Sequence, residues 1–111
     1  MIAQVRPADF DDWLRAQGDR PLLLDVREPW EVQTAHVAPG EFDVVAIPMN
    51  EIPGRLGELP QDRPIACLCH HGARSLRVAM FLAQQGYTDV ANVAGGIDAW
   101  SRERDPGIPL Y

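Results

Sequence analysis

The sequence predicts an α/β fold in which a five-stranded, mainly parallel sheet carries helices on both faces. Short apolar runs alternate with amphipathic helical segments along the whole chain, as in sheets built from right-handed crossovers. The run 21–26 is almost continuously apolar, which is typical of a strand buried on both faces. A length of 111 residues fits a single domain covering residues 1–111.

Five segments are expected to form strands, and turn residues separate them from the helices. The strands are residues 2–5, 21–26, 44–47, 65–68 and 89–93. Helices are expected at residues 7–17, 29–35, 50–59, 76–85 and 97–104. The first helix begins at Pro7 and ends before Gly18, and Asn50 is suited to cap the third. The fourth helix, 76–85, is apolar almost all round and is expected to be largely buried.

Composition and charge limit the classes of function. The formal net charge of −6 argues against a general nucleic-acid or anionic-membrane surface. No apolar run approaches the length of a membrane span, and residues 1–6 do not resemble a signal peptide. The two cysteines, Cys67 and Cys69, are expected to be free thiols, which suits a reducing compartment such as the cytoplasm.

The stretch from Cys69 to Ser75 carries the strongest functional signal. It lies between the apolar run 65–68 and the helical run from Leu76, so the expected order is strand, tight loop and helix N-terminus. Such a loop points backbone N–H groups at an anion, and a helix N-terminus with a nearby guanidinium favours a thiolate over a thiol. The interpretation is a nucleophilic Cys69 thiolate, with Gly72 allowing the tight turn and Arg74 neutralising a bound anion.

This loop resembles the active-site loop of rhodanese-like sulfurtransferases, which has the pattern Cys-x-x-Gly-x-Arg-Ser/Thr. The stretch 23–28, Leu-Leu-Asp-Val-Arg-Glu, is similar to the family's early Asp-x-Arg signature. The stretch 92–100, Asn-Val-Ala-Gly-Gly-Ile-Asp-Ala-Trp, is similar to its closing Gly-Gly-x-x-Ala-Trp signature. The three stretches lie in the family's order and span nearly the whole chain.

The resemblance implies a rhodanese-like fold and transfer of a sulfane sulfur from thiosulfate or a persulfide to a thiol or cyanide. A persulfide on Cys69 would carry the sulfur, without metal or organic cofactor, and a protein could act as donor or acceptor. The residues implied in binding the substrate are His70, His71, Gly72, Ala73, Arg74 and Ser75, with Asp25 and Arg27 in support.

Several residues have a second interpretation. Asp25 interrupts an apolar strand, so it either pairs with Arg74 or caps the turn that follows it. Arg77 could add positive charge beside the loop. Cys67 lies within the apolar strand and is expected to be an inert core residue.

The histidines beside Cys69 raise the question of a metal site. His70 and His71 could bind an ion together with Cys69, and His36 could join them. Adjacent residues rarely chelate one ion and the usual zinc spacings are absent, so no metal site is expected. His70 stands where many family members carry a permanent cation, which lowers the expected use of thiosulfate at neutral pH.

Two rival functions and one insertion complete the sequence-based expectations. Cysteine phosphatases and arsenate reductases of similar fold need five residues between cysteine and arginine to surround a tetrahedral oxyanion, whereas four intervene between Cys69 and Arg74. A non-catalytic binding module of the same family is the second rival.

Residues 41–44 resemble a small insertion that could enlarge a loop near the site.

Overall fold

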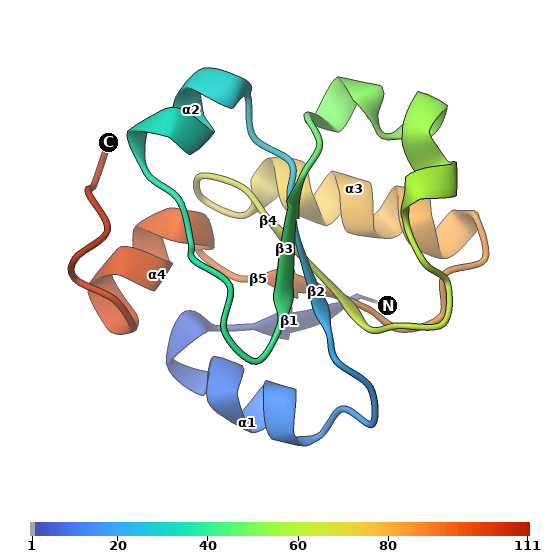
Figure 1. The fold of residues 1–111 in the computed structure, drawn as a ribbon, viewed down its shortest axis with the longest axis horizontal. Helices are drawn as coiled ribbons and strands as arrows, with labels where there is room; N and C mark the ends of the chain where they lie inside the picture. Colours follow the sequence, from blue (N-terminus) through green and yellow to red (C-terminus); the bar gives the residue numbers. More distant parts are fainter. Residues whose placement is uncertain (1) are drawn as a thin grey trace.

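A computed structural model describes residues 2–111 and contains a five-stranded sheet in which every pairing is parallel. The strand order is β1-β5-β4-β2-β3. The strands are β1 (Ala3–Val5), β2 (Leu22–Asp25), β3 (Asp43–Ala46), β4 (Ile65–Leu68) and β5 (Val90–Val93). Figure 1 shows the strands at the centre of the molecule with the helices around them. The five-stranded sheet confirms the predicted fold class.

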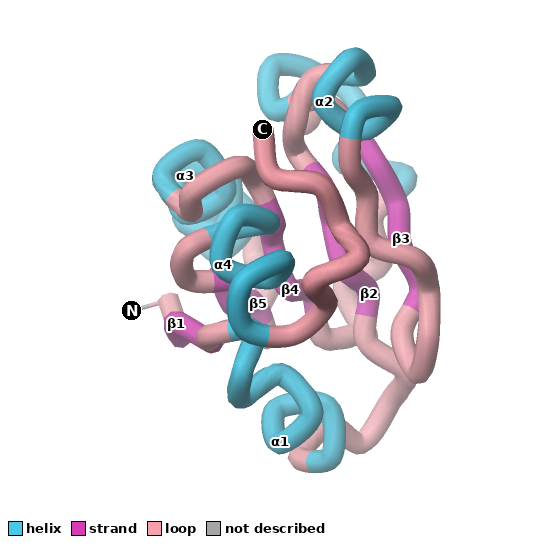
Figure 2. The backbone as a smooth tube through the Cα atoms, turned by 90° about the vertical axis from the view of Figure 1, so that its left-hand side faces the viewer, coloured by secondary structure: helices cyan, strands magenta, loops and turns pink. Residues whose placement is uncertain are grey.

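The helices cover both faces of the sheet, and the core is accordingly split into two layers (Figure 2). The helices are α1 (Phe10–Arg15), α2 (Pro29–Thr34), α3 (Ala73–Gln84) and α4 (Gly96–Glu103). On one face Phe10 of α1 and Trp100 of α4 pack against Leu23 and Ala66. On the other face Val78 and Leu82 of α3 pack among the residues of the second layer.

The predicted helix 50–59 is wrong in type. The chain instead forms two 3-10 segments, Met49–Glu51 and Pro53–Glu58, and the second is kinked at Arg55. Asn50 lies inside the first segment and caps nothing through its side chain. Pro53 and Gly54 interrupt the segment because proline lacks a backbone donor and glycine is a poor helix former.

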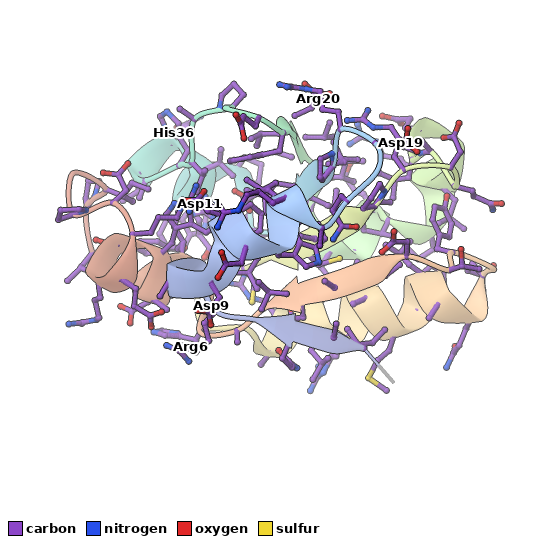
Figure 3. The ribbon with its side chains drawn as sticks, turned by 90° about the horizontal axis from the view of Figure 1, so that it is seen from below. Arg6, Asp9, Asp11, Asp19, Arg20 and His36 are labelled. Carbon is purple, nitrogen blue, oxygen red and sulfur yellow. The ribbon has the colours of Figure 1, made fainter. Side chains whose placement is uncertain are left out.

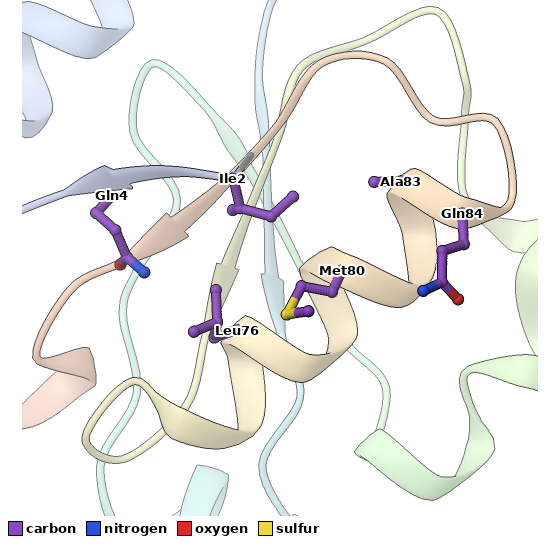
Figure 4. A pocket seen from close by; sticks show the side chains of 6 residues that line it. All are labelled: Ile2, Gln4, Leu76, Met80, Ala83 and Gln84. Atoms are coloured by element: carbon purple, nitrogen blue, oxygen red, sulfur yellow. The ribbon is translucent and has the colours of Figure 1, made fainter.

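Helix α3 is buried on one side only, which corrects the expectation that it is largely enclosed. Met80 on its outer side is 51% exposed, because no further helix packs over it. Figure 4 shows this outer side facing the segment around β1 across a cavity of about 460 Å³. The cavity is lined by Ile2, Gln4, Leu76, Met80, Ala83 and Gln84.

The insertion at residues 41–44 lies away from the loop that follows β4. Asp43 begins β3 and is paired with Leu22 at the start of β2, so the insertion lies at the amino ends of the parallel strands. Phe42 is 4% exposed and packs edge-on against the ring of Phe10. The insertion therefore supplies a core side chain and does not enlarge the loop at residues 69–75.

Within residues 2–111, no helix is long and apolar enough to cross a lipid bilayer. The longest, α3, has 12 residues, whereas a span needs about 20.

Candidate active site

The sulfur of Cys69 lies at the carboxyl end of β4, just before α3 begins at Ala73. The backbone N–H of Gly72 donates a hydrogen bond to Sγ of Cys69 over 3.0 Å. The hydroxyl of Ser75 lies 3.2 Å from the same sulfur and 3.3 Å from the carbonyl oxygen of Gly72. Gly72 has a φ of 107°, a value that other residues rarely adopt. The tight turn therefore brings one amide and one hydroxyl onto the sulfur.

The N-terminus of α4 holds the backbone of this loop. The N–H of Ile97 donates to the carbonyl oxygen of Cys69 over 2.9 Å, and the N–H of Asp98 donates to that of His70 over 3.1 Å. The first N–H groups of a helix have no partner within it, and α4 has no side-chain cap. The carbonyls of the Cys69 loop therefore act as the cap of α4.

Gly96 makes this contact possible. A β-carbon placed on Gly96 would lie 2.6 Å from the carbonyl oxygen of Cys69 and still closer to that of His70. Its φ of 64° also lies in the left-handed region. Only glycine lets α4 approach the loop backbone this closely, which explains the second glycine of the Gly-Gly pair.

Asn92 on β5 fixes the other side of the loop. Its side-chain Nδ2 donates to the carbonyl oxygen of Gly72 over 3.1 Å and to Oε1 of Gln4 over 3.0 Å. Asn92 is 2% exposed, and its amide connects the loop to Gln4 on the edge strand β1. The carbonyls of Cys69, His70 and Gly72 are thus each held by a partner outside the loop.

Arg74 is bound to Glu31 of α2, and not to Asp25 as one interpretation of the sequence proposed. Its two terminal nitrogens donate to the two carboxylate oxygens of Glu31 over 2.7 and 2.9 Å. Hydrogen bonding to Arg74 is the main reason that the pKa of Glu31 falls to about 2. Because this fork is bidentate, the guanidinium is oriented by α2 and its charge is balanced at neutral pH.

Asp25 takes the second role proposed for it and caps the turn after β2. Its Oδ1 accepts the backbone N–H of Arg27 over 3.1 Å, and its Oδ2 accepts from Nη2 of Arg27 over 2.6 Å. Arg27 is completely buried and also donates to the carbonyl oxygens of Glu31 and Ala35. The pair therefore ties the end of β2 to α2, which carries the carboxylate that orients Arg74.

Tyr111 links the two ion pairs. Its hydroxyl donates to Oε2 of Glu31 over 2.7 Å and accepts from Nη1 of Arg27 over 3.0 Å. Burial, helped by Glu31 and opposed by Arg27, raises the pKa of Tyr111 to about 12. The hydroxyl therefore keeps its proton for Glu31 across the physiological pH range.

The rings of His70, His71 and Tyr111 form a stack at the mouth of the loop. His70 lies between the other two rings, with centroid distances of 3.9 Å to each. Potential ligand atoms of His70, His71 and Asp98 lie within 4.8 Å of one another. In a tetrahedral zinc site the ligand atoms lie about 3.3 Å apart, and their lone pairs converge on the ion. The lone pairs of two stacked rings instead point in nearly parallel directions. These rings would have to turn to hold a metal ion.

Three residues considered in the sequence lie outside this arrangement. His36 is exposed and belongs to no metal-ligating group among the described residues. Figure 3, the view from below, labels it together with Asp11 and Arg20. Arg77 lies beside Met49 at a separate small cavity. Cys67 is fully buried in β4, and desolvation strongly raises the pKa of its thiol.

A sequence profile of the Rhodanese-like domain matches residues 7–103. The chain belongs to the rhodanese-like family. It is 40% identical over 89 residues to a protein of Allochromatium vinosum named sulfurtransferase, covering 80% of this chain and 77% of that one. It is 31% identical to the probable adenylyltransferase/sulfurtransferase MoeZ of Mycobacterium tuberculosis, covering 96% of this chain but only 26% of the larger protein.

Solved structures agree with this assignment. A rhodanese-related protein from Thermoplasma volcanium superposes with a TM-score of 0.78 at 31% identity, covering 98% of this chain and 99% of that one. A rhodanese homologue from Thermus thermophilus gives a TM-score of 0.61 at 29% identity, covering 86% of this chain and 96% of that one. The chain is therefore a rhodanese-like protein of the sulfurtransferase type.

Sequence reasoning missed three residues of the rhodanese-like site. Glu31 and Asn92 are buried polar residues that hold Arg74 and the Gly72 carbonyl, and Tyr111 joins the ion pairs. A signal for the first two existed, because a buried carboxylate or amide must find a partner. No local pattern indicated Tyr111, which lies in a tail without periodicity.

Proposed function

We propose that this rhodanese-like protein transfers a sulfane sulfur through a persulfide on Cys69. The observation that carries the proposal is the sulfur of Cys69 at the end of β4, which receives the Gly72 amide and lies beside the Ser75 hydroxyl. Both donors can stabilise a thiolate before the reaction and a persulfide afterwards. The sulfurtransferase names of the relatives support the same reaction class.

The proposed reaction has two half-steps. The Cys69 thiolate attacks the outer sulfur of the donor, a new S–S bond forms, and the donor's own S–S bond breaks. Thiosulfate then leaves as sulfite with the bonding electron pair, and an organic persulfide leaves as a thiolate. Cyanide or a thiol attacks the terminal sulfur in the second half-step and restores the Cys69 thiolate, so ping-pong kinetics are expected.

Within this proposal the other loop residues bind and orient the donor. The Gly72 amide, which donates to Sγ of Cys69, would also face the transferred sulfur, and Arg74 closes the loop in the orientation that Glu31 imposes. The Arg74 side chain is 32% exposed, so it is partly accessible to a donor that binds at the loop. Asp25 and Arg27 support the loop indirectly by anchoring α2.

Incubation of the reduced protein with thiosulfate or an organic persulfide is expected to add one sulfur atom to Cys69. Cyanide should remove that atom as thiocyanate. Intact-mass measurement after each step, with peptide mapping, follows both half-steps. Cys69→Ser should abolish them without unfolding the protein, whereas Cys67→Ala, a change in the core of β4, should retain them. The reaction proposed here is wrong if neither donor modifies Cys69, and the binding-module function then replaces it.

Hydrolysis of an aryl phosphate is expected to be undetectable, because the four-residue spacing is too short for a phosphate. The loop also packs closely against the residues that precede α4, since a β-carbon on Gly72 would lie 3.2 Å from the amide nitrogen of Gly95. Inserting one glycine after Gly72 should lower sulfur transfer and raise the affinity for tungstate, a tetrahedral oxyanion. Turnover of p-nitrophenyl phosphate by the unmodified protein would show that this size argument fails.

A further inference from the structure

Few positive charges remain available at the mouth of the Cys69 loop. Arg74 is held by both oxygens of Glu31, and the buried Arg27 is held by both oxygens of Asp25. Arg77, the next arginine of α3, borders a different cavity. The titratable side chain that directly follows the reactive cysteine is His70, which is stacked on the exposed His71.

The ring of Tyr111 encloses His70. The two rings are parallel to within 6° at a centroid distance of 3.9 Å, and His71 covers the opposite face. The Nε2 atom of His70 is buried and has no hydrogen-bond partner among the described residues. An imidazolium would place a charged N–H at this position without an acceptor, which is costly.

The charged surroundings of His70 do not reverse this preference. Burial and the neighbouring His71 lower the pKa of His70, against weaker opposite effects of the Tyr111 backbone, of Glu31 on α2 and of Asp98 on α4. The carboxylates of Glu31 and Asp98 are already paired with Arg74 and Arg102. His70 is therefore uncharged at neutral pH.

We propose that Tyr111 is a specificity-determining residue: its ring keeps His70 enclosed and uncharged, and the site thereby disfavours dianionic donors such as thiosulfate relative to persulfides. Tyr111 acts through His70 and does not touch the reacting atoms. Its hydroxyl fixes the position of the ring because it is bonded to Glu31 on one side and to Arg27 on the other. The proposal rests on the proposed sulfur transfer, and it names the class of donor that this site prefers.

The test compares two donors in two variants. The ratio of kcat/KM for thiosulfate to that for cysteine persulfide is measured with cyanide as acceptor at pH 6.5 and pH 8.5. Tyr111→Leu should raise this ratio about threefold at pH 6.5, because a full unit charge about 4 Å from an anion in water has about a fivefold effect and an exposed histidine is about half protonated at this pH. The ratio should change little at pH 8.5, where an exposed histidine is also neutral. Tyr111→Phe keeps the ring but removes the hydroxyl that holds it, and should raise the ratio by less than Tyr111→Leu does.

Two further measurements separate specificity from a purely structural role. In a His70→Gln background, Tyr111→Leu should no longer change the ratio, because no titratable group remains to be uncovered. Titration of the His70 ring by NMR should show its pKa rising in Tyr111→Leu and unchanged in Trp30→Leu, which alters a ring next to Tyr111 but not next to His70.

Each outcome decides the proposal. An unchanged or lower ratio in Tyr111→Leu, or an effect that persists without His70, overturns it. If Tyr111→Leu does not fold, the NMR titration of the unmodified protein still tests the proposal. A His70 pKa at or above the ordinary value of about 6.5 would show that Tyr111 does not shield His70. Failure of both donors to modify Cys69 would refute the sulfurtransferase function itself, and the NMR titration would still report whether Tyr111 shields His70.

Discussion

Replacement of Gly96 by alanine is expected to lower the rate of sulfur transfer by about 100-fold, because misplacing a reactive group by about 1 Å has an effect of that size. The added methyl group would overlap the backbone of Cys69 and His70, which has no flexible side chain that could move aside. Either α4 or the loop must shift, and the bonds from Ile97 and Asp98 to the loop carbonyls would be lost. Steady-state kinetics with either donor, together with a thermal unfolding curve, measures both effects.

Gly86→Ala is the matched control for this prediction. Gly86 also has a positive φ, 96°, but a β-carbon there would meet nothing within 4 Å. This variant therefore measures the cost of the backbone angle alone, about 1–2 kcal/mol of unfolding free energy. Equal losses of activity in the two variants would mean that the contact between α4 and the loop does not matter for the reaction.

Arg27→Met is expected to destabilise the protein by about 3–5 kcal/mol, the cost of leaving one member of a buried ion pair unpaired. Arg27 is 0% exposed, and its removal would strand Asp25, which is 2% exposed. It would also loosen α2, because the carbonyl oxygen of Ala35 would lose its Arg27 donor and that of Glu31 would keep only the Ala35 N–H. Urea denaturation monitored by tryptophan fluorescence gives the free energy of unfolding.

A second substitution and a surface control test the origin of this loss. Asp25→Asn in the Arg27→Met background should recover about half of the lost stability, because no uncompensated charge then remains inside. Arg15→Met breaks an ion pair with Asp12 in which both side chains are more than two-thirds exposed, and it should leave stability almost unchanged. A large effect of Arg15→Met, or a small one of Arg27→Met, would contradict the role assigned to burial.

The sheet could be predicted because the residues that form each strand are neighbours in the sequence. The fully buried strands β2 and β4 are apolar runs bounded by proline and polar residues. The segment 49–58 could not be predicted in the same way. Ile52 within it and Leu59 just after it are buried, but Pro53 and the glycines decide that the backbone forms 3-10 turns.

In the candidate site, too, contacts between neighbouring residues could be predicted from the sequence, and contacts between distant residues could not. The order strand, loop, helix and the left-handed Gly72 follow from neighbouring residues and were predictable. The partner of Arg74 could not be predicted from the sequence, because Asp25 and Glu31 are both acidic residues near the end of β2. Asp25 is taken by Arg27, two residues away, and the turn of α2 brings Glu31 to Arg74. Only the packing of α2 against the loop distinguishes the two carboxylates.

The contact between α4 and the loop also has a consequence for the time at which activity can arise during synthesis. Cys69 leaves the ribosome well before Gly96, and the carbonyls of Cys69 and His70 have no helix N-terminus to hold them until then. β1 also has no strand to pair with until β5 has been synthesised, because Ala3 pairs with Ala91. Contacts between residues so far apart in sequence form late and slowly. We therefore expect the proposed sulfur transfer to become possible only when the sheet closes around β5.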